Sequence, residues 1–140
     1  HRYAWRSGQM IGLDTNVLVR YIMQDDPKQS IMATQLIESL DVDGPGFVTL
    51  VSIVELYWVL TSCYKLNAEQ VNQALMVLLQ AKQIVVDRAD QVLRALRVFE
   101  NSKADFADCL IERISASAGC TQTMTFDVGA TKHAGMTLVV

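Results

Sequence analysis

The most informative stretch of the chain is Ile11-Gly12-Leu13-Asp14-Thr15-Asn16-Val17-Leu18-Val19-Arg20. Residues 10–13 are apolar and predict a short buried strand that ends at Asp14. The apolar spacing that follows predicts a helix over Thr15–Met23. Asp14 therefore falls at the carboxyl end of a strand, which is where open α/β sheets bind their ligands.

The same alternation of short apolar runs and helical patterns continues along the chain, and it predicts βαβ units with a parallel sheet. Further strands are expected at 47–51, 83–86, 120–126 and, as an edge strand, 136–140. Further helices are expected from Pro27 to about 40, and at 52–66, 67–81, 87–99 and 105–118. Asp127 is expected to begin a turn or a short helix.

Several helix ends are predicted by their capping residues. Asp26 is expected as an N-cap with Pro27 at the first helical position. Ser52 is expected as the next N-cap, with Glu55 at the spacing of a capping box. Gly119 is expected to end the helix over 105–118. The buried stripe of the helix that follows Ser52 is predicted to contain these residues: Ile53, Leu56, Tyr57, Leu60 and Tyr64.

Length and composition favour one compact domain. The chain has 140 residues, of which 51% are hydrophobic and 19% are charged, and this composition argues against disorder. No apolar run reaches the roughly 20 residues that a membrane span needs. We expect residues 1–9 to be a remnant of an expression vector and residues 10–140 to form the domain, with Met10 as the natural start.

Charge and cysteine content narrow the function further. The formal net charge of −3 is unfavourable for tight, non-specific nucleic-acid binding, although a local basic rim is compatible with it. The three cysteines contain no CxxC pair, so a cysteine-rich zinc site is not expected. Their number and spacing fit a reducing cytoplasm.

Acidic residues follow the predicted strands. Asp14 comes after the first strand, Glu55 lies in the first turn of the helix after the second, and Asp127 comes after the fourth. Asp105 and Asp108 share one helix face. Carboxylates that converge in this way repel one another, and a hard cation such as Mg²⁺ or Mn²⁺ would neutralise their negative charge.

Four segments in this order resemble the PIN-domain family and, within it, the VapC-type toxins of bacterial toxin–antitoxin pairs. They are 11–20, Val51-Ser52-Ile53-Val54-Glu55-Leu56, Asp105-Phe106-Ala107-Asp108-Cys109-Leu110-Ile111 and Thr123-Met124-Thr125-Phe126-Asp127. The resemblance covers about residues 10–140. It implies a single α/β PIN-like domain with a central, mostly parallel sheet of four to five strands flanked by helices.

The resemblance also implies a metal-dependent ribonuclease. Asp14, Glu55, Asp108 and Asp127 match the four acidic positions of the family, and Asp105 is an alternative third acid or a supporting partner. Thr15, Asn16 and Thr125 match polar positions that hold the carboxylates or the attacking water.

The mechanism expected from this acidic set is hydrolysis by a metal-activated water. One or two Mg²⁺ or Mn²⁺ ions would be held by Asp14, Asp108 and Asp127, with Glu55 and Asp105 as further candidate ligands. Glu55 would bind the water or accept its proton, and the product would carry a 5′-phosphate. The candidate contacts to RNA phosphates are Arg20, Lys103, Arg113 and Lys132.

The partners implied are an RNA of unknown class, a cognate antitoxin protein and a second copy of the chain. The helix expected over 52–66 is apolar on nearly all sides, which favours a homodimer or a groove for a partner. The alternatives are an inactive PIN-fold module that binds RNA or acts as a scaffold, and a phosphatase of the haloacid dehalogenase type. The phosphatase needs a second Asp where this chain has Asn16. A receiver domain needs a pair of acidic residues at the end of its first strand. This chain has Leu13 before Asp14 at that place, which argues against a receiver domain.

Overall fold

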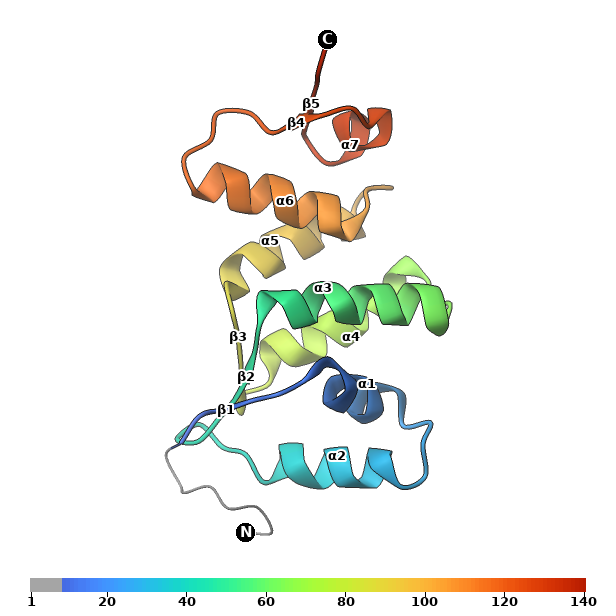
Figure 1. The fold of residues 1–140 in the computed structure, drawn as a ribbon, viewed down its shortest axis with the longest axis vertical. Helices are drawn as coiled ribbons and strands as arrows, with labels where there is room; N and C mark the ends of the chain where they lie inside the picture. The colour runs from blue at the N-terminus through green and yellow to red at the C-terminus, as the bar shows by residue number, and fades with distance from the viewer. Residues whose placement is uncertain (1–8) are drawn as a thin grey trace. The chain divides into compact units, whose positions relative to one another are not determined.

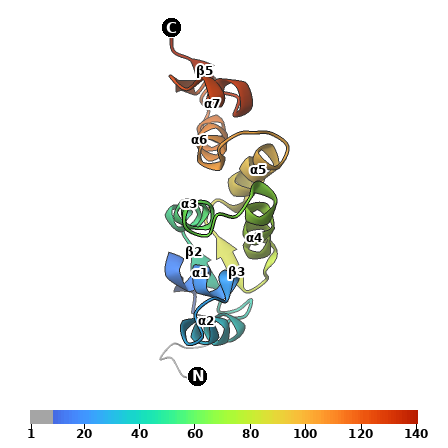
Figure 2. The ribbon, with the colours of Figure 1, turned by 90° about the vertical axis from the view of Figure 1, so that its right-hand side faces the viewer.

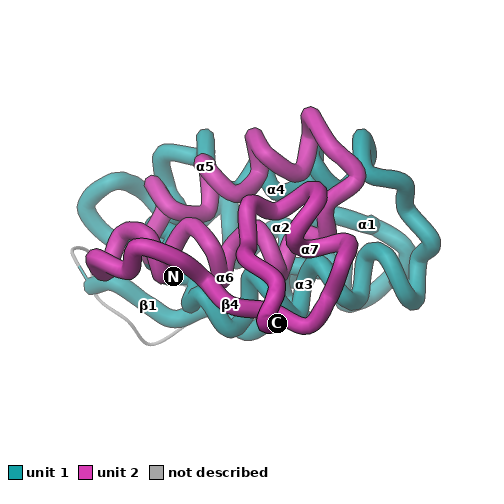
Figure 3. Tube along the Cα trace, turned by 90° about the horizontal axis from the view of Figure 1, so that it is seen from above, with its two compact units in different colours: residues 1–87 teal, residues 88–140 magenta. Residues whose placement is uncertain are grey.

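The computed structural model describes residues 9–140 of the chain. The segment 1–9, which we expected to be a vector remnant, falls outside the described residues except for Gln9. The chain divides into two compact units, one ending at Asp87 and the other comprising Arg88–Val140 (Figure 3). We describe each unit by itself.

The first unit contains a parallel sheet of three strands in the order β1-β2-β3. Gly46 in the central strand is paired with Ile11 on one side and with Ile84 on the other. The elements of this unit, in chain order, are β1 (Ile11–Gly12), α1 (Thr15–Met23), α2 (Gln29–Glu38), β2 (Gly46–Val48), α3 (Leu50–Trp58), η1 (Val59–Cys63), α4 (Ala68–Gln80) and β3 (Ile84–Val86).

Helix α1 packs against both α2 and α3, and α4 packs against β3 (Figures 1 and 2). η1 is a π-helical turn that continues α3. The core of the unit is aliphatic, which supplies the apolar burial that stabilises a domain of this size. Its fully buried side chains include Leu18, Ile37, Val48, Ile53, Leu56, Leu60, Val71, Leu75 and Leu78.

The second unit contains α5 (Ala89–Glu100), α6 (Phe106–Ser117), β4 (Met124–Thr125), α7 (Val128–His133) and β5 (Thr137–Leu138). Helices α5 and α6 pack against each other. Phe99 and Phe106 join them edge to face, with ring centroids 5.9 Å apart. Strands β4 and β5 form a separate parallel pair, in which α7 contacts both strands.

The predicted α/β class and the parallel pairing of the strands are confirmed. The strand grouping differs from the expected single sheet, because the five strands form one sheet of three and one of two. The predicted helix over Thr15–Met23 is confirmed residue for residue, with Asp14 as its N-cap. Gly119 follows the last turn of α6 with φ of +101°, as a helix-ending glycine does.

The predicted N-cap at Ser52 is wrong. α3 begins at Leu50, and the side chain of Thr49 accepts a hydrogen bond of 3.1 Å from the backbone N of Ser52. β2 ends at Val48, three residues earlier than expected, so the helix begins earlier as well. Glu55 is therefore beyond the first turn of α3, and the capping-box interpretation of its side chain is wrong too.

The start of α2 is closer to its predicted position than the start of α3 is. The helix begins at Gln29, two residues after the expected Pro27. The N-cap is Lys28, without a side-chain cap, so the predicted N-cap at Asp26 is wrong. Asp26 still supports this turn, because its Oδ1 accepts hydrogen bonds from the backbone N of Lys28 at 3.0 Å and of Gln29 at 2.7 Å.

One packing expectation needs correction. Tyr64, expected in the buried stripe of the second helix, follows η1 and is only half-buried, because its hydroxyl bonds to polar groups at the surface. The other four residues of that stripe are buried, as predicted. Helix α2 buries Ser30, Ala33 and Ile37, while Ile31 and Met32 are exposed.

Within residues 9–140, no helix is both long enough and apolar enough to cross a lipid bilayer.

Candidate functional site

Asp14 lies where β1 passes into α1. The backbone N of Leu13 donates to the carbonyl oxygen of Phe47 at 2.9 Å, so the parallel ladder continues up to the residue before Asp14. Oδ1 of Asp14 then accepts a hydrogen bond of 2.8 Å from the backbone N of Thr15. The cap uses one carboxylate oxygen and holds the side chain at the carboxyl end of the strand.

Thr15 connects this helix start with α3. Its side chain is buried, and Oγ1 donates a hydrogen bond of 3.0 Å to Oε1 of Glu55. Thr15 thus bonds to Asp14 through its backbone and to Glu55 through its hydroxyl. Two carboxylates that are 41 positions apart in the sequence are tied to one residue. Asn16, the next residue, is exposed beside them.

Three further acids belong to the second unit. Asp105 is the N-cap of α6, and its Oδ1 accepts a hydrogen bond of 3.1 Å from the backbone N of Asp108. Asp127 is the N-cap of α7, and its Oδ1 accepts from the backbone N of Gly129 at 2.7 Å. Thr125 supports this turn, because its Oγ1 accepts from the backbone N of Asp127 at 3.0 Å.

The carboxylates of the second unit influence one another. The pKa of Asp108 is raised, first because partial burial penalises its charged form and second because Asp105 and Asp127 repel its negative charge. The result is an anionic patch on this unit that favours positive charge nearby.

A divalent cation was expected to compensate such repulsion. Within residues 9–140 no three Asp, Glu, His or Cys side chains form a group that could hold a metal ion. The acids are divided between the units, two in the first and three in the second. The donor chemistry still fits a hard cation, because all five expected ligands are carboxylates, which suit Mg²⁺ and Mn²⁺ better than softer metals.

The four cations expected near RNA differ in their surroundings. The guanidinium of Arg20 is engaged by Asp25, Gln29 and Tyr64. Nη2 of Arg113 donates to Oε2 of the neighbouring Glu112 at 2.8 Å. The other two, Lys103 and Lys132, are exposed.

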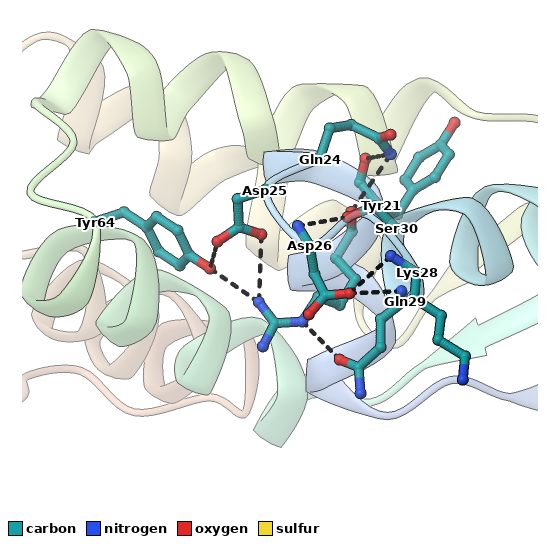
Figure 4. A network of polar contacts seen from close by, with 9 residues as sticks. Tyr21, Gln24, Asp25, Asp26, Lys28, Gln29, Ser30 and Tyr64 are labelled. Carbon is teal, nitrogen blue, oxygen red and sulfur yellow. Dashed lines mark hydrogen bonds and ion pairs between the residues drawn. The ribbon is translucent and has the colours of Figure 1, made fainter.

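The polar network around Arg20 was not predicted from the sequence (Figure 4). The Tyr64 hydroxyl donates to Oδ2 of Asp25 at 2.7 Å and accepts from Nη1 of Arg20 at 3.1 Å. Nη1 of Arg20 also donates to Oδ1 of Asp25 at 3.3 Å, and Nε donates to Oε1 of Gln29 at 2.9 Å. In the sequence, the only feature that indicates this network is the acidic Asp25, which follows the end of α1 that contains Arg20.

Beside the network, α1 and α2 enclose an open, mainly apolar groove with a volume of about 260 Å³. Its lining residues are Asn16, Val17, Arg20, Gln29, Met32, Ala33 and Leu36. Exposed apolar surface of this kind is often covered by another protein.

Comparison with known families gives one match. The family model described as PIN domain matches residues 11–135, which include all five acids. PIN domains are generally nucleases and typically use divalent metals. A search of curated proteins found no match for the chain.

Proposed function

Since the chain belongs to the PIN-domain family, we propose that it is a Mg²⁺- or Mn²⁺-dependent ribonuclease of the VapC toxin type. The observation that carries this proposal is the family match over 11–135. It is supported by four carboxylates that resemble the acidic positions of the family. These are Asp14, Glu55, Asp108 and Asp127.

In this proposal Asp14, Asp108 and Asp127 hold one or two cations, and Asp105 is either a further ligand or a supporting group. When bound, the cation neutralises charge on the phosphodiester and makes a water more acidic. Asn16 and Thr125 orient Asp14 and Asp127, each of which lies two residues away in the chain.

Glu55 acts as the general base. The Thr15 hydroxyl occupies Oε1 of Glu55, which leaves Oε2 to accept the proton of the attacking water. The water oxygen bonds to phosphorus as the bond to the 3′-oxygen breaks, and the 3′-oxygen takes up a proton. The products are a 5′-phosphate and a 3′-hydroxyl.

Basic side chains would position the RNA by its phosphates. Lys103 and Lys132 are the strongest candidates, because both are exposed and neither has an ion pair among the described residues. Arg20 and Arg113 already bond to carboxylates. They would contact RNA only through guanidinium N–H groups that are not used in those bonds.

The test is cleavage of total bacterial RNA with Mg²⁺ or Mn²⁺, followed by end-group chemistry. Asp14→Asn and Glu55→Gln should abolish cleavage, and EDTA should do the same. The matched controls are Asp43→Asn and Glu38→Gln, which make the same changes at exposed positions far along the chain from the proposed acids. Both controls should cleave like the wild type.

Fragments with 5′-phosphates that disappear in the two site variants and in EDTA would support the proposal. Cyclic 2′,3′-phosphate ends would contradict the mechanism. If no RNA is cleaved, titration calorimetry decides the point. Mn²⁺ binding that is lost in Asp14→Asn supports the metal site, and unchanged or absent binding indicates an inactive scaffold.

The proposed inhibitor is a cognate antitoxin, and the groove between α1 and α2 is its proposed binding surface. A partner helix with apolar side chains would cover Val17, Met32 and Leu36 there. Met32→Asp should abolish binding of the proposed antitoxin and leave RNA cleavage unchanged. Retained binding would place the antitoxin elsewhere.

A homodimer is proposed through the outer face of α3, where Val51 is 69% and Trp58 is 53% exposed. Light scattering on the eluted protein should give twice the chain mass for the wild type and a smaller mass for Trp58→Ser. A monomeric wild type would contradict the dimer. We propose the cytoplasm as the place of action, since RNA substrates are found there.

A further inference from the structure

Two side-chain hydrogen bonds connect α1 to α3 and to the residue after its π-helical continuation. At the start of α1, Thr15 bonds to Glu55 of α3. Toward its other end, Arg20 bonds to Tyr64, which directly follows the π-helical continuation of α3. The second connection includes Asp25, in the loop after α1, and Gln29, at the start of α2 (Figure 4).

The π-helical turn places Tyr64 in this network. In η1 the backbone N of Tyr64 donates to the carbonyl oxygen of Val59 at 3.2 Å, five residues earlier instead of four. A wider turn of this kind changes the direction of the residues that follow, and such turns are frequent at functional sites. The ring of Tyr64 is half-buried, while its hydroxyl reaches the two charged groups.

The contacts within the network are charge-assisted. The hydroxyl of Tyr64 donates to a carboxylate and accepts from a guanidinium, and bonds of both kinds are stronger than those between neutral groups. Donation to Asp25 raises the pKa of Tyr64, and the same bond lowers the pKa of Asp25. At neutral pH the hydroxyl is therefore protonated and the carboxylate ionised, which keeps the network intact.

We infer that Tyr64 is a positioning residue for Glu55, because its hydroxyl fixes the end of η1, which continues α3, to α1 and thereby holds the Thr15–Glu55 contact. A helix transmits such a constraint as a stiff element. The inference rests on the proposed function only for the catalytic role of Glu55. The coupling between the two ends of α1 is a separate and measurable property.

The first test is free of any assumption about activity. Tyr64→Phe removes the hydroxyl and keeps the ring, and Tyr21→Phe makes the same change on α1, where no hydrogen bond to the hydroxyl is shown within the described residues. In ¹H–¹⁵N spectra, Tyr64→Phe should shift the amide signals of Thr15 and Glu55, and Tyr21→Phe should leave them in place. Asp25→Ser, which removes the acceptor, should reproduce the shifts of Tyr64→Phe.

If Tyr64→Phe shifts only the amide signals of residues near 20–29 and 59–65, the inference is overturned, whether or not the protein cleaves RNA. Equal shifts from both tyrosine variants would overturn it as well.

The second test uses RNA cleavage. Tyr64→Phe should lower kcat by about tenfold, at the low end of what loss of a supporting partner causes, and leave KM within about twofold. Combined with Thr15→Val, it should lower kcat by less than the product of the two single effects, because both variants loosen the same contact. Independent effects, or a change in KM alone, would contradict the inference. A wild type that does not cleave would count against the proposed function, while the amide shifts would still decide the coupling.

Discussion

The hydroxyl of Thr15 and Oε1 of Glu55 are 3.0 Å apart, although the two residues are separated by 40 positions in the sequence. This hydrogen bond joins the start of α1 to α3, and it fixes one of the two oxygens of a proposed general base.

Removing that hydroxyl should slow RNA cleavage. We expect Thr15→Val to reduce kcat roughly 10-fold to 100-fold, because the carboxylate loses its donor and its fixed orientation. Thr15→Ser keeps a hydroxyl and should retain most of the activity. Equal losses in the valine and serine variants would show that the methyl group matters and the hydrogen bond does not.

Asp108 should destabilise the metal-free protein at neutral pH. Its pKa is raised in the folded state by burial and by Asp105 and Asp127, so the folded state favours the protonated form. Stability is therefore lost as the pH rises through the folded pKa and is recovered below the usual value of 3.8. In EDTA at pH 7, Asp108→Asn should melt at a higher temperature than the wild type, and the difference should shrink below about pH 4. Asp43→Asn serves as the control and should melt with the wild type throughout. A lower melting temperature for Asp108→Asn at pH 7 would contradict this assignment.

The start of α3 can be tested by two substitutions. Thr49→Ala removes the observed cap and should lower the free energy of unfolding by about 1 kcal/mol. Ser52→Ala should cost less, because the cap at Thr49 remains and alanine is the better helix former. Urea unfolding of both variants measures the difference. The opposite order would support the cap that the sequence predicted.

The three cysteines should differ in reactivity. Cys109 is buried, and burial followed by repulsion from nearby carboxylates raises its pKa from 9.0 to about 11. Its thiol is therefore protonated at pH 7.5 and shielded from reagents. Cys63 and Cys120 are exposed. A thiol reagent should modify two cysteines quickly in the native protein, and the third only after unfolding. Rapid modification of Cys109 in the native protein would show that α6 is less well packed than described.

Much of the fold could be predicted because its determinants are local. The helix over Thr15–Met23 follows from an apolar spacing and an adjacent capping aspartate. The hydrogen bond between Thr15 and Glu55 agrees with the expectation that residues after neighbouring parallel strands lie close together, since β1 and β2 are parallel neighbours and their carboxyl ends meet. The assignment of roles to the acids stays a prediction, because it comes from the family resemblance.

The remaining features depend on contacts that no local pattern encodes. Tyr64 bonds to Arg20 across 44 positions, and a π-helical turn sets its direction. With α-helical spacing, the same residue was predicted to be buried. The buried residues of α2 are Ser30, Ala33 and Ile37, while Ile31 and Met32 are exposed.

The distribution of the proposed acids over both compact units has a genetic consequence. Asp14 and Glu55 belong to the first unit, and Asp105, Asp108 and Asp127 belong to the second. A premature stop codon at any position before 127 leaves a product that lacks at least one of them. If the protein is the toxin nuclease proposed above, a cell harmed by it can escape through nonsense or frameshift alleles along most of the reading frame. Selection would keep the intact allele only where the protein is restrained or useful to its host.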